Sequence, residues 1–468
     1  MREDQLARLR RGEKLTLRQQ ILLTLRLSVP AILAQLSTIA MQYIDASMVG
    51  QLGAGDAASI GLVASTTWLF GGLTTAAVLA FTVQVAQRIG AGDEKDARNL
   101  MKQGMVIAVL FSLLLAAVGA AIAGSLPVWL RADPAIRPHA TAYFLIFALS
   151  LPIMALSSLG AGMLQSSGNM RTPSILMALS CLLDVVFNAL LIFPARTLWG
   201  VTVPGAGLGV IGAALGTSAA HAVNAALLLF FLLRRSPALH LRRGEKLRFV
   251  PEQLRRGWKL ALPVAAERVI MCSAQIVSTG IIAPLGTVAI AAHSFAITAE
   301  ALCYMPGYGM EPAASTLIGQ SVGAERRDLT YRLGWLVTTL AMVIMGLSAV
   351  VLFFAAPYII GVMTPDREVV ALATAVLRIV LLAEPLYGAS IVASGTFQGA
   401  GNTLPSTVLN LASMWCVRIP LTAALAARYG LPGAWVAMTI ELAVRGTLFL
   451  LWLGSKRWLP REWRQKTK

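Results

Sequence analysis

Long apolar stretches separated by short polar segments follow one another along the chain from about Ile21 to Leu453. Each is long enough to cross a hydrocarbon layer of about 30 Å at about 1.5 Å per residue. Glycine and proline are scattered through them and polar residues do not alternate with apolar ones, which predicts helices rather than a β-barrel. The predicted spans are 20–46, 57–86, 103–129, 140–164, 173–194, 208–233, 257–282, 288–319, 333–359, 370–397, 406–428 and 432–454.

Composition agrees with this pattern. Of the 468 residues, 57% are hydrophobic and 13% are charged, whereas a soluble globular chain has about 25% charged residues. We therefore predict an all-α integral membrane protein with twelve transmembrane helices. Its four cysteines fall inside predicted spans without metal-ligand spacing, so we expect no disulfide, no fixed metal and no organic cofactor. They are Cys181, Cys272, Cys303 and Cys416.

The two halves of the sequence repeat each other. A shift of 233 residues aligns scarce residue types without a gap, which favours a true duplication. Six spans in each half place both halves in the same direction across the membrane, as two six-helix bundles related by a parallel repeat. This arrangement is typical of transporters with a substrate site between the bundles. The aligned pairs include Pro30 with Pro263, Gln87 with Gln320, Pro152 with Pro385, Gln165 with Gln398 and Asn169 with Asn402.

The repeat also predicts the domain boundaries. Beyond the fifth span the shift falls to 221 residues, so the first half has about 12 extra residues near Pro194 to Gly209. The predicted segments are a tail over 1–19, an amino-terminal bundle over 20–233, a basic linker over 234–256, a carboxy-terminal bundle over 257–454 and a tail over 455–468.

The distribution of positive charge predicts the orientation. The sequence has 39 lysines and arginines against 22 aspartates and glutamates. Of these basic residues, 29 lie in the two tails, in the central linker and in the loops on the same predicted face, and five lie in the opposite loops. By the positive-inside rule both termini are cytoplasmic, and the basic surplus indicates contact with anionic lipid rather than with nucleic acid.

A few polar and charged side chains lie inside the predicted spans. Inserting such groups into a membrane costs free energy, so each is a candidate for a functional role. Asp45 near the end of the first span either binds a proton or small cation, or caps the loop that follows. Asp184 and Asn188 are four residues apart and share a helix face, which suits either a cation site or an interhelical hydrogen bond. The other intramembrane carboxylates are Glu267, Glu300, Glu311, Glu384 and Glu441.

Prolines accompany two of these acids. Glu267 follows Pro263 by four residues, and Glu384 directly precedes Pro385. Proline frees a backbone carbonyl and loosens a helix, so these positions, with Pro30 in the first span, are candidates for gating. Arg268, beside Glu267, leaves a structural ion pair open there. Glu441 and Arg445 are four residues apart, which predicts a local ion pair.

Several segments together resemble the multidrug and toxic compound extrusion (MATE) transporters, in their bacterial branch. The resemblance covers nearly the whole chain except the tails. It rests on Asp45-Ala-Ser-Met-Val-Gly50, the Gln-x-x-Gly-Ala pattern after spans 2 and 8, Pro263-x-x-x-Glu267, Met305-Pro-Gly-Tyr-Gly309, Gln398-Gly-Ala-Gly-Asn-Thr403 and Trp415-Cys-Val-Arg418-Ile-Pro-Leu421.

The resemblance implies site residues. Asp45 matches the acid of an amino-lobe cation site, Glu267 and Glu384 match a carboxy-lobe site, and Glu300 matches the eighth-helix glutamate of many members. Na+ would then bind at Asp45, Glu267 or Glu384. Arg418 joins the prolines as a structural or gating candidate. The fifth span departs from the family pattern, because Asp184-x-x-x-Asn188 reverses the usual order of amide and acid.

The implied function is an efflux antiporter in the bacterial cytoplasmic (inner) membrane. It would export organic, often cationic and amphipathic, compounds or drugs in exchange for inward H+ or Na+ by alternating access. We expect no enzyme activity and no nucleic-acid partner, and we expect a monomer among membrane lipids. The alternatives are a flippase for lipid-linked oligosaccharides, which would need cationic residues such as Arg268, Arg378 or Arg418 in its cavity, and a major-facilitator transporter.

Overall fold

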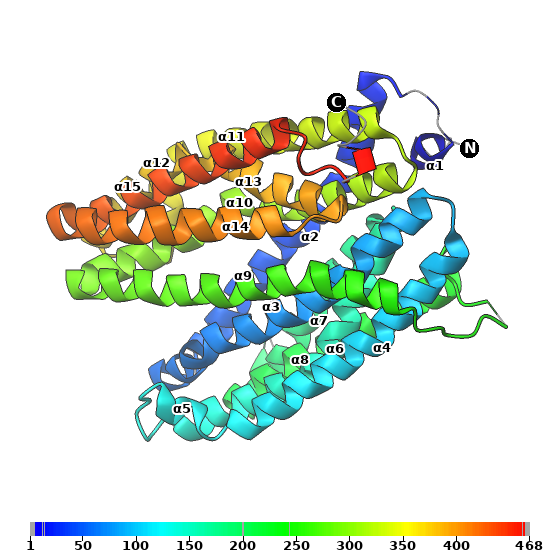
Figure 1. The fold of residues 1–468 in the computed structure, drawn as a ribbon. Helices are drawn as coiled ribbons and strands as arrows, with labels where there is room; N and C mark the ends of the chain where they lie inside the picture. Colours follow the sequence, from blue (N-terminus) through cyan, green and yellow to red (C-terminus); the bar gives the residue numbers. More distant parts are fainter. Residues whose placement is uncertain are drawn as a thin grey trace. The chain divides into compact units, whose positions relative to one another are not determined.

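The computed structural model describes residues 5–11, 13, 15–198, 201–242, 244–460 and 462–463. The predicted tails 1–19 and 455–468 are thus described in part, and residues 1–4, 12, 14, 461 and 464–468 of them lie outside the described residues. The described chain is helical apart from its loops and one two-stranded sheet (Figure 1).

The helices of the first half are α1 (Gln5–Arg10), α2 (Leu17–Gly50), α3 (Ala54–Gly90), α4 (Glu94–Ile122), α5 (Leu126–Trp129), α6 (Arg137–Ser166), α7 (Arg171–Ile192), α8 (Gly209–Phe230) and the π-helix η1 (Phe231–Arg235). Those of the second half are α9 (Pro251–Ile282), the 3₁₀-helix η2 (Ala283–Leu285), α10 (Thr287–Gly323), α11 (Arg327–Met363), α12 (Arg367–Leu381), α13 (Glu384–Gly399), α14 (Leu404–Ala412), the π-helix η3 (Ser413–Arg418) and α15 (Ile419–Gly454).

The described helices account for the twelve predicted spans. Ten helical segments are long and apolar enough to cross a membrane, and α12 with α13 forms one more span that is bent by 58°. One of the ten, Leu404–Gly454, has 51 residues and contains the last two predicted spans. It breaks at Gly430, whose φ of 62° and ψ of −145° are not helical.

Two predicted spans are not continuous helices. The tenth, 370–397, stops at Leu381 and restarts at Glu384, with Pro385 in the first turn of α13. Proline is tolerated in a first turn but not in a helix interior, because it has no N–H to donate, so Pro385 begins a new helix. The third, 103–129, ends with α4 at Ile122, and the short α5 follows separately. Pro30 and Pro263 lie inside α2 and α9.

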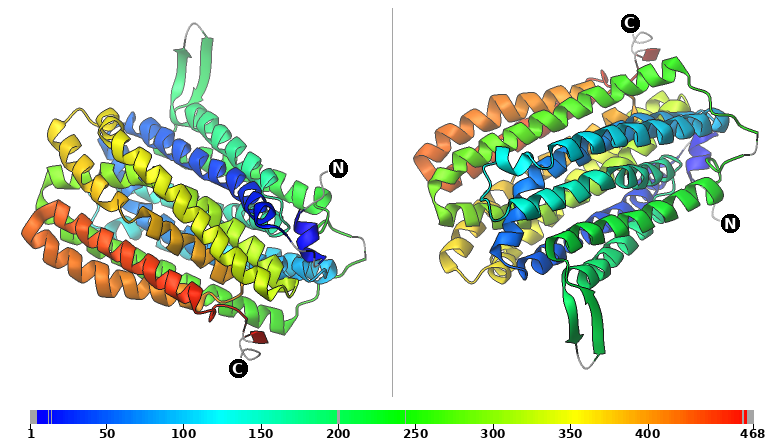
Figure 2. Two further views of the ribbon diagram at one scale, coloured as in Figure 1. Left: turned by 90° about the horizontal axis from the view of Figure 1, so that it is seen from above. Right: turned by 90° about the horizontal axis from the view of Figure 1, so that it is seen from below.

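The extra residues of the first half form a β-hairpin between α7 and α8. Strand β1 (Pro194–Leu198) pairs antiparallel with β2 (Val201–Ala206), with Leu198 opposite Val201. Figure 2 shows the hairpin projecting beyond the ends of the two helices that it joins. The hairpin is an addition to the predicted all-α membrane fold, which the twelve spans confirm.

Contacts divide the chain into two compact units. Unit 1 comprises Met1–Leu36, Ala86–Gly92 and Leu262–Lys468, and unit 2 comprises Ser37–Val85 and Asp93–Ala261. The chain passes from one unit to the other at four points: inside α2, inside α3, between Gly92 and Asp93, and inside α9. The bundle boundaries 20–233 and 257–454 stay a prediction from the repeat, and the basic segment before α9 belongs to unit 2.

Each unit has its own apolar core. In unit 1 the core includes Trp435, which is 1% exposed, and its indole Nε1 donates to His293 Nδ1 at 3.1 Å. In unit 2 the core includes Phe70 and Phe144, whose rings meet edge to face with centroids 5.8 Å apart. Burial of side chains of this size, at about 25 cal/mol per Å2 of apolar surface, fixes the helices that carry the polar residues described below.

The Gln-x-x-Gly-Ala pattern makes a reciprocal contact within unit 1. A Cβ on Gly90 would overlap the backbone of Gln320, and a Cβ on Gly323 would overlap the backbone of Gln87. The Gln87 amide also donates to the carbonyl of Gly399 at 2.8 Å. The repeated motif therefore brings the ends of α3 and α10 into backbone contact, which only glycine permits.

Candidate functional site

The first candidate site lies in unit 2, near the ends of α2 and α7. Asn188 Nδ2 donates to Asp45 Oδ1 at 3.0 Å and to Asp184 Oδ2 at 3.2 Å. Asp184 and Asn188 are each 1% exposed, and Asp45 is half-buried. We call these three residues the amino-terminal acid site. One amide thus bridges two carboxylates, although the order of acid and amide in α7 is reversed.

This site has acceptors to spare. Within the described residues, Asp184 Oδ1 and Asn188 Oδ1 are buried and accept no hydrogen bond. In the same part of the chain no lysine or arginine forms an ion pair with Asp45 or Asp184. Two carboxylates so close together, one buried and one half-buried, repel each other when no positive charge lies between them.

Gly216 in α8 makes room for the bridging amide. A Cβ at this position would overlap Asn188 Oδ1 and would contact its backbone nitrogen at 3.0 Å. Helices α7 and α8 can therefore pack closely at the site because residue 216 has no side chain. The sequence does not single out this glycine among its 40.

The second candidate site lies in unit 1, where α10 faces the break between α12 and α13. Glu300 is 1% exposed and Glu384 is fully buried. The Glu384 carboxyl lies beside Glu300 and Cys303. Within the described residues, three carboxyl oxygens of this site have no hydrogen-bond partner. They are Glu384 Oε1, Glu384 Oε2 and Glu300 Oε1. We call Glu300 and Glu384 the carboxy-terminal acid site.

Two arginines lie close to this second site. Arg445 pairs with Glu441, with Nε to Oε1 at 2.9 Å, as their spacing predicts. Arg418, at the end of η3, lies 3.9 Å from Glu441 Oε2 and also donates to Met438 Sδ at 3.1 Å. Both arginines interact electrostatically with Glu300. Arg418 is thus part of a buried ion network, and π-helical turns such as η3 often mark functional positions.

Glu267 has different hydrogen-bond partners from the acids of the two sites above. Its carboxyl accepts from Thr407 Oγ1 at 3.0 Å and from Asn410 Nδ2 at 2.7 Å, both in α14. Glu311 nearby accepts from Gln398 Nε2 at 3.0 Å. Thr407 and Asn410 are not singled out by the sequence. Their three-residue spacing on one helix face was the available signal.

Three tyrosines form an aromatic cluster beside the arginines. Tyr304 meets Tyr308 and Tyr387 edge to face, with centroids 5.9 and 5.8 Å apart. The Arg445 guanidinium lies over the Tyr387 ring at 5.2 Å. Such rings present negative faces that attract cations. The cluster escapes sequence reasoning because Tyr387 is far from the other two along the chain.

A family model comparison matches the chain twice. The MatE model covers residues 30–190 and 263–424, so its two matches begin 233 residues apart. This spacing is the shift that aligns the two halves of the sequence, and it supports the internal duplication.

Known proteins resemble this chain along most of its length, in sequence and in fold. The chain is 26% identical to a probable multidrug resistance protein NorM from Thermotoga maritima over 448 residues, 93% of each chain. It is 28% identical to a protein of the same description from Deinococcus radiodurans, covering 90% of this chain and 92% of that one. A crystal structure of MATE in complex with MaL6 superposes with a TM-score of 0.87 at 19% identity, covering 97% of this chain and 98% of that one. At that identity the structure shows a shared fold.

Proposed function

The chain belongs to the MatE family of multidrug and toxic compound extrusion transporters, and we propose that it is an efflux antiporter. It exports organic, often cationic and amphipathic, compounds in exchange for inward H+ or Na+ by alternating access. We assign it to the bacterial cytoplasmic membrane, and the excess of basic residues on one face supports a cytoplasmic position for both termini. The relatives named above, described as multidrug resistance proteins, support the export of drugs.

The observation that carries this proposal is the amino-terminal acid site. The buried Asp184 and the half-buried Asp45 share one amide and have no basic partner among the described residues. An incoming H+ or Na+ neutralises this pair, and the pair then loses its attraction for a cationic substrate. Because each ligand favours a different state of the site, the two fluxes are coupled through their differential affinity.

The carboxy-terminal acid site supplies a second place for ion coupling. Glu300 and Glu384 lie beside each other, and in the part of the chain that the structure describes both carboxyl oxygens of Glu384 and Oε1 of Glu300 lack a hydrogen-bond partner. A shared proton or cation would relieve their repulsion. Glu267, with its hydroxyl and amide partners, offers oxygen atoms of the kind that bind Na+. The tyrosine cluster provides the apolar and cation-attracting surface that an amphipathic cation requires.

The flippase alternative is less well supported by the same contacts. It needs free cationic groups to bind a pyrophosphate, but Arg418 is engaged with Glu441 and Met438, and Arg378 Nε donates to the Phe353 carbonyl at 3.1 Å. Of the three arginines that the sequence offers for this role, only Arg268 is exposed. The match to the MatE model also disfavours a major-facilitator transporter.

The test is transport by the purified protein in proteoliposomes, with H+ and Na+ gradients imposed separately and a fluorescent organic cation as the probe. Wild type should move the probe under at least one gradient. Asp45→Asn and Glu267→Gln should reduce gradient-driven transport, while Asp133→Asn, in an exposed loop, should not. Wild-type transport by both Asp45→Asn and Glu267→Gln would overturn the proposal.

A further inference from the structure

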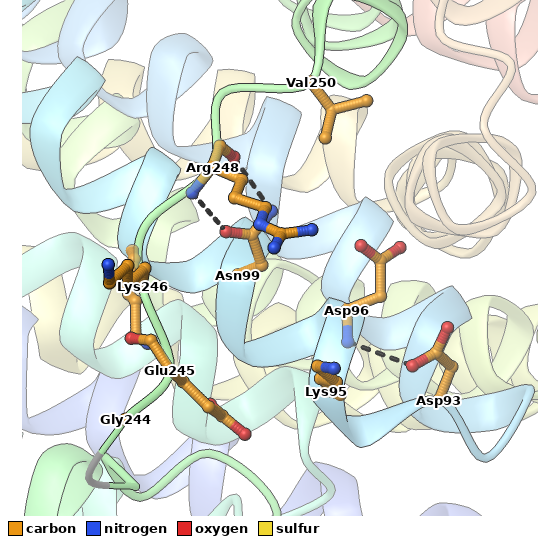
Figure 3. Close-up of a pocket in the computed structure, with 10 residues that line it drawn as sticks. Asp93, Lys95, Asp96, Asn99, Gly244, Glu245, Lys246, Arg248 and Val250 are labelled. Atoms are coloured by element: carbon orange, nitrogen blue, oxygen red, sulfur yellow. Dashed lines mark hydrogen bonds and ion pairs between the residues drawn. The ribbon is translucent and has the colours of Figure 1, made fainter.

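A charged pocket of about 670 Å3 lies in unit 2, at the amino-terminal end of α4 (Figure 3). One wall is the start of α4, and the other is the extended segment that leads into α9. None of the residues of the two acid sites lines this pocket, and its wall before α9 lies outside the two segments that match the MatE model. Its lining residues are Asp93, Lys95, Asp96, Asn99, Lys102, Gly244, Glu245, Lys246, Arg248 and Val250.

The two walls are fixed to each other by a set of hydrogen bonds. Arg98 is 2% exposed, and its guanidinium donates to Glu245 Oε2 at 2.9 Å and Oε1 at 2.7 Å, and to the Ala238 carbonyl at 3.1 Å. Asn99 exchanges two hydrogen bonds of 3.0 Å with the backbone of Arg248, as Figure 3 shows. The pocket is therefore built by tertiary structure rather than by loose loops.

Its positive groups remain available to a ligand. The side chains of Lys95, Lys246 and Arg248 are exposed and form no ion pair within the described residues. The two acids at the start of α4, Asp93 and Asp96, accept hydrogen bonds from the protein. Asp93 Oδ1 accepts from the Asp96 N–H at 3.0 Å, and Asp96 accepts from Gln253 Nε2 at 2.8 Å. These donors are uncharged, so Asp93 and Asp96 keep their negative charge, but the three cations outnumber them and form no ion pair among the described residues.

The extended wall has one charged and one apolar side. Lys246, Arg248 and Val250 line the pocket, whereas Leu247 and Phe249, which alternate with them, do not. Leu247 and Phe249 are 38% and 51% exposed, and Trp258 in the first turns of α9 is 61% exposed. The apolar part of α4 begins about six residues after Asn99, or roughly 9 Å along the helix. The headgroup layer extends about 5–7 Å beyond the hydrocarbon on each side, so the pocket lies at its outer edge, beside the layer where aromatic side chains gather.

We propose that this pocket binds the phosphate of a membrane phospholipid headgroup. Lys246, Arg248 and Lys95 contact the phosphate, and Leu247 and Phe249 lie against the lipid surface beside it. The apolar side chains favour a lipid over a free phosphate, because a soluble anion gains nothing from them. A bound lipid joins the basic segment to α4 in addition to the Arg98–Glu245 pair.

The test is binding of fluorescent short-chain phosphatidylglycerol to the full-length protein in a neutral detergent. The double variant Lys246→Gln/Arg248→Gln should bind roughly thirtyfold more weakly, because each of the two basic residues near an anionic lipid contributes about 1 kcal/mol and about 1.4 kcal/mol is tenfold. The matched control is Arg255→Gln/Lys259→Gln, which removes the same charge from exposed positions outside the pocket. Its affinity should stay within about twofold of wild type. Equal weakening of both variants, or of neither, would overturn the proposal.

Competition identifies the source of the phosphate. Phosphatidylethanolamine should displace the probe, whereas diacylglycerol, which lacks the phosphate, and inorganic phosphate at the same concentration should not. Displacement by diacylglycerol would show that the headgroup is not recognised. Displacement by inorganic phosphate would identify a free anion as the ligand and would contradict the lipid assignment.

Discussion

The two acid sites use buried carboxylates in different surroundings. In the amino-terminal acid site, Asp45 and Asp184 share an amide and have no arginine or lysine paired with them among the described residues. In the carboxy-terminal acid site, Glu300 interacts with Arg418 and Arg445, and Glu384 lies beside Glu300. Fixed positive charges already compensate part of the second site, so a mobile cation matters more to the first.

The difference matters for coupling. A carboxylate pair without a counter-charge changes its charge state or its ligand as an ion arrives, whereas a pair near arginines has a permanent partner. We infer that the amino-terminal acid site is the more sensitive to the driving ion. Beside the carboxy-terminal acid site, Arg418 and Arg445 form an ion network with Glu441.

The largest expected effect is a difference in efflux rate between variants of the two acid sites. Asp184→Asn should reduce ion-driven efflux about tenfold or more, because it removes half of the uncompensated charge that couples the two fluxes. Glu300→Gln should reduce it less, since the nearby arginines remain. Initial rates in proteoliposomes under one imposed gradient measure both variants. A larger loss for Glu300→Gln would reverse the comparison.

The second prediction tests whether the order of acid and amide matters in the amino-terminal acid site, with the same set of side chains present. The double variant Asp184→Asn/Asn188→Asp exchanges the acid and the amide within α7, and the two positions lie on one helix face. The exchanged amide and acid should still bridge to Asp45, so efflux should recover substantially relative to Asp184→Asn alone. Transport by the double variant no better than by Asp184→Asn would show that the position of the acid is fixed by something other than this face.

The third prediction concerns stability in the carboxy-terminal site. Glu441→Gln leaves Arg445 and Arg418 buried without their carboxylate and should destabilise the protein by about 3–5 kcal/mol. The double variant Glu441→Leu/Arg445→Met should recover much of that loss, because it removes both charges of the pair. Thermal unfolding in detergent compares the three proteins. An unchanged midpoint for Glu441→Gln would mean that the ion network contributes little.

The fourth prediction tests the packing behind the amino-terminal site. Gly216→Ala should displace Asn188 and weaken efflux, because the added Cβ overlaps the amide oxygen. Gly71→Ala is the matched control, since a Cβ there meets no atom within 4 Å. The expected loss of stability is about 1–3 kcal/mol, typical of overpacking. Equal transport and stability for the two variants would contradict the assigned role of Gly216.

The smallest effect lies outside both acid sites, at the segment before α9. The hydrogen bond from Arg98 holds the pKa of Glu245 below its ordinary value of 4.5, and the charges of Arg98, Lys102 and Arg242 add to this. A lowered pKa means that the pair stabilises the folded state above pH 4.5 and that this contribution is lost as the pH falls through the lower folded value.

Hydrogen exchange in residues 244–250 should therefore increase on acidification in wild type. It should be high at every pH in Glu245→Gln, because the substituted amide cannot carry the charge that Arg98 requires. Because Glu245 is solvated, the energetic effect is small. A pH-independent wild-type segment would contradict the assigned pair, and the result distinguishes acid effects at this segment from those at the two acid sites.

Much of the fold follows from the sequence. Apolar length predicts the twelve spans because a membrane leaves backbone groups no partner except the helix itself. The 233-residue shift predicts the duplication because proline, glutamine and asparagine are scarce in such a chain. The helix break at Pro385 could have been predicted, since proline is favoured in the first turn of a helix. The predicted spans miss it because the apolar pattern continues through this position without interruption.

The site could be predicted only as a set of candidates. The cost of burying charge singles out Asp45, Asp184, Glu267, Glu300 and Glu384 without structural information. Their grouping depends on which helices are neighbours. Asn188 bridges Asp45 and Asp184, Glu384 lies beside Glu300, and Glu267 bonds to Thr407 and Asn410 instead.

The sequence by itself thus determined which residues are too polar for their surroundings, and how often the chain crosses the membrane. The tertiary structure decided which of those residues meet, and which have a compensating charge. The physical reason is distance. The cost of placing a charge in an apolar helix is local and can be read from one segment, whereas part of its compensation comes from distant side chains, from Asn188 for Asp45 and from Asn410 for Glu267, each 143 residues away.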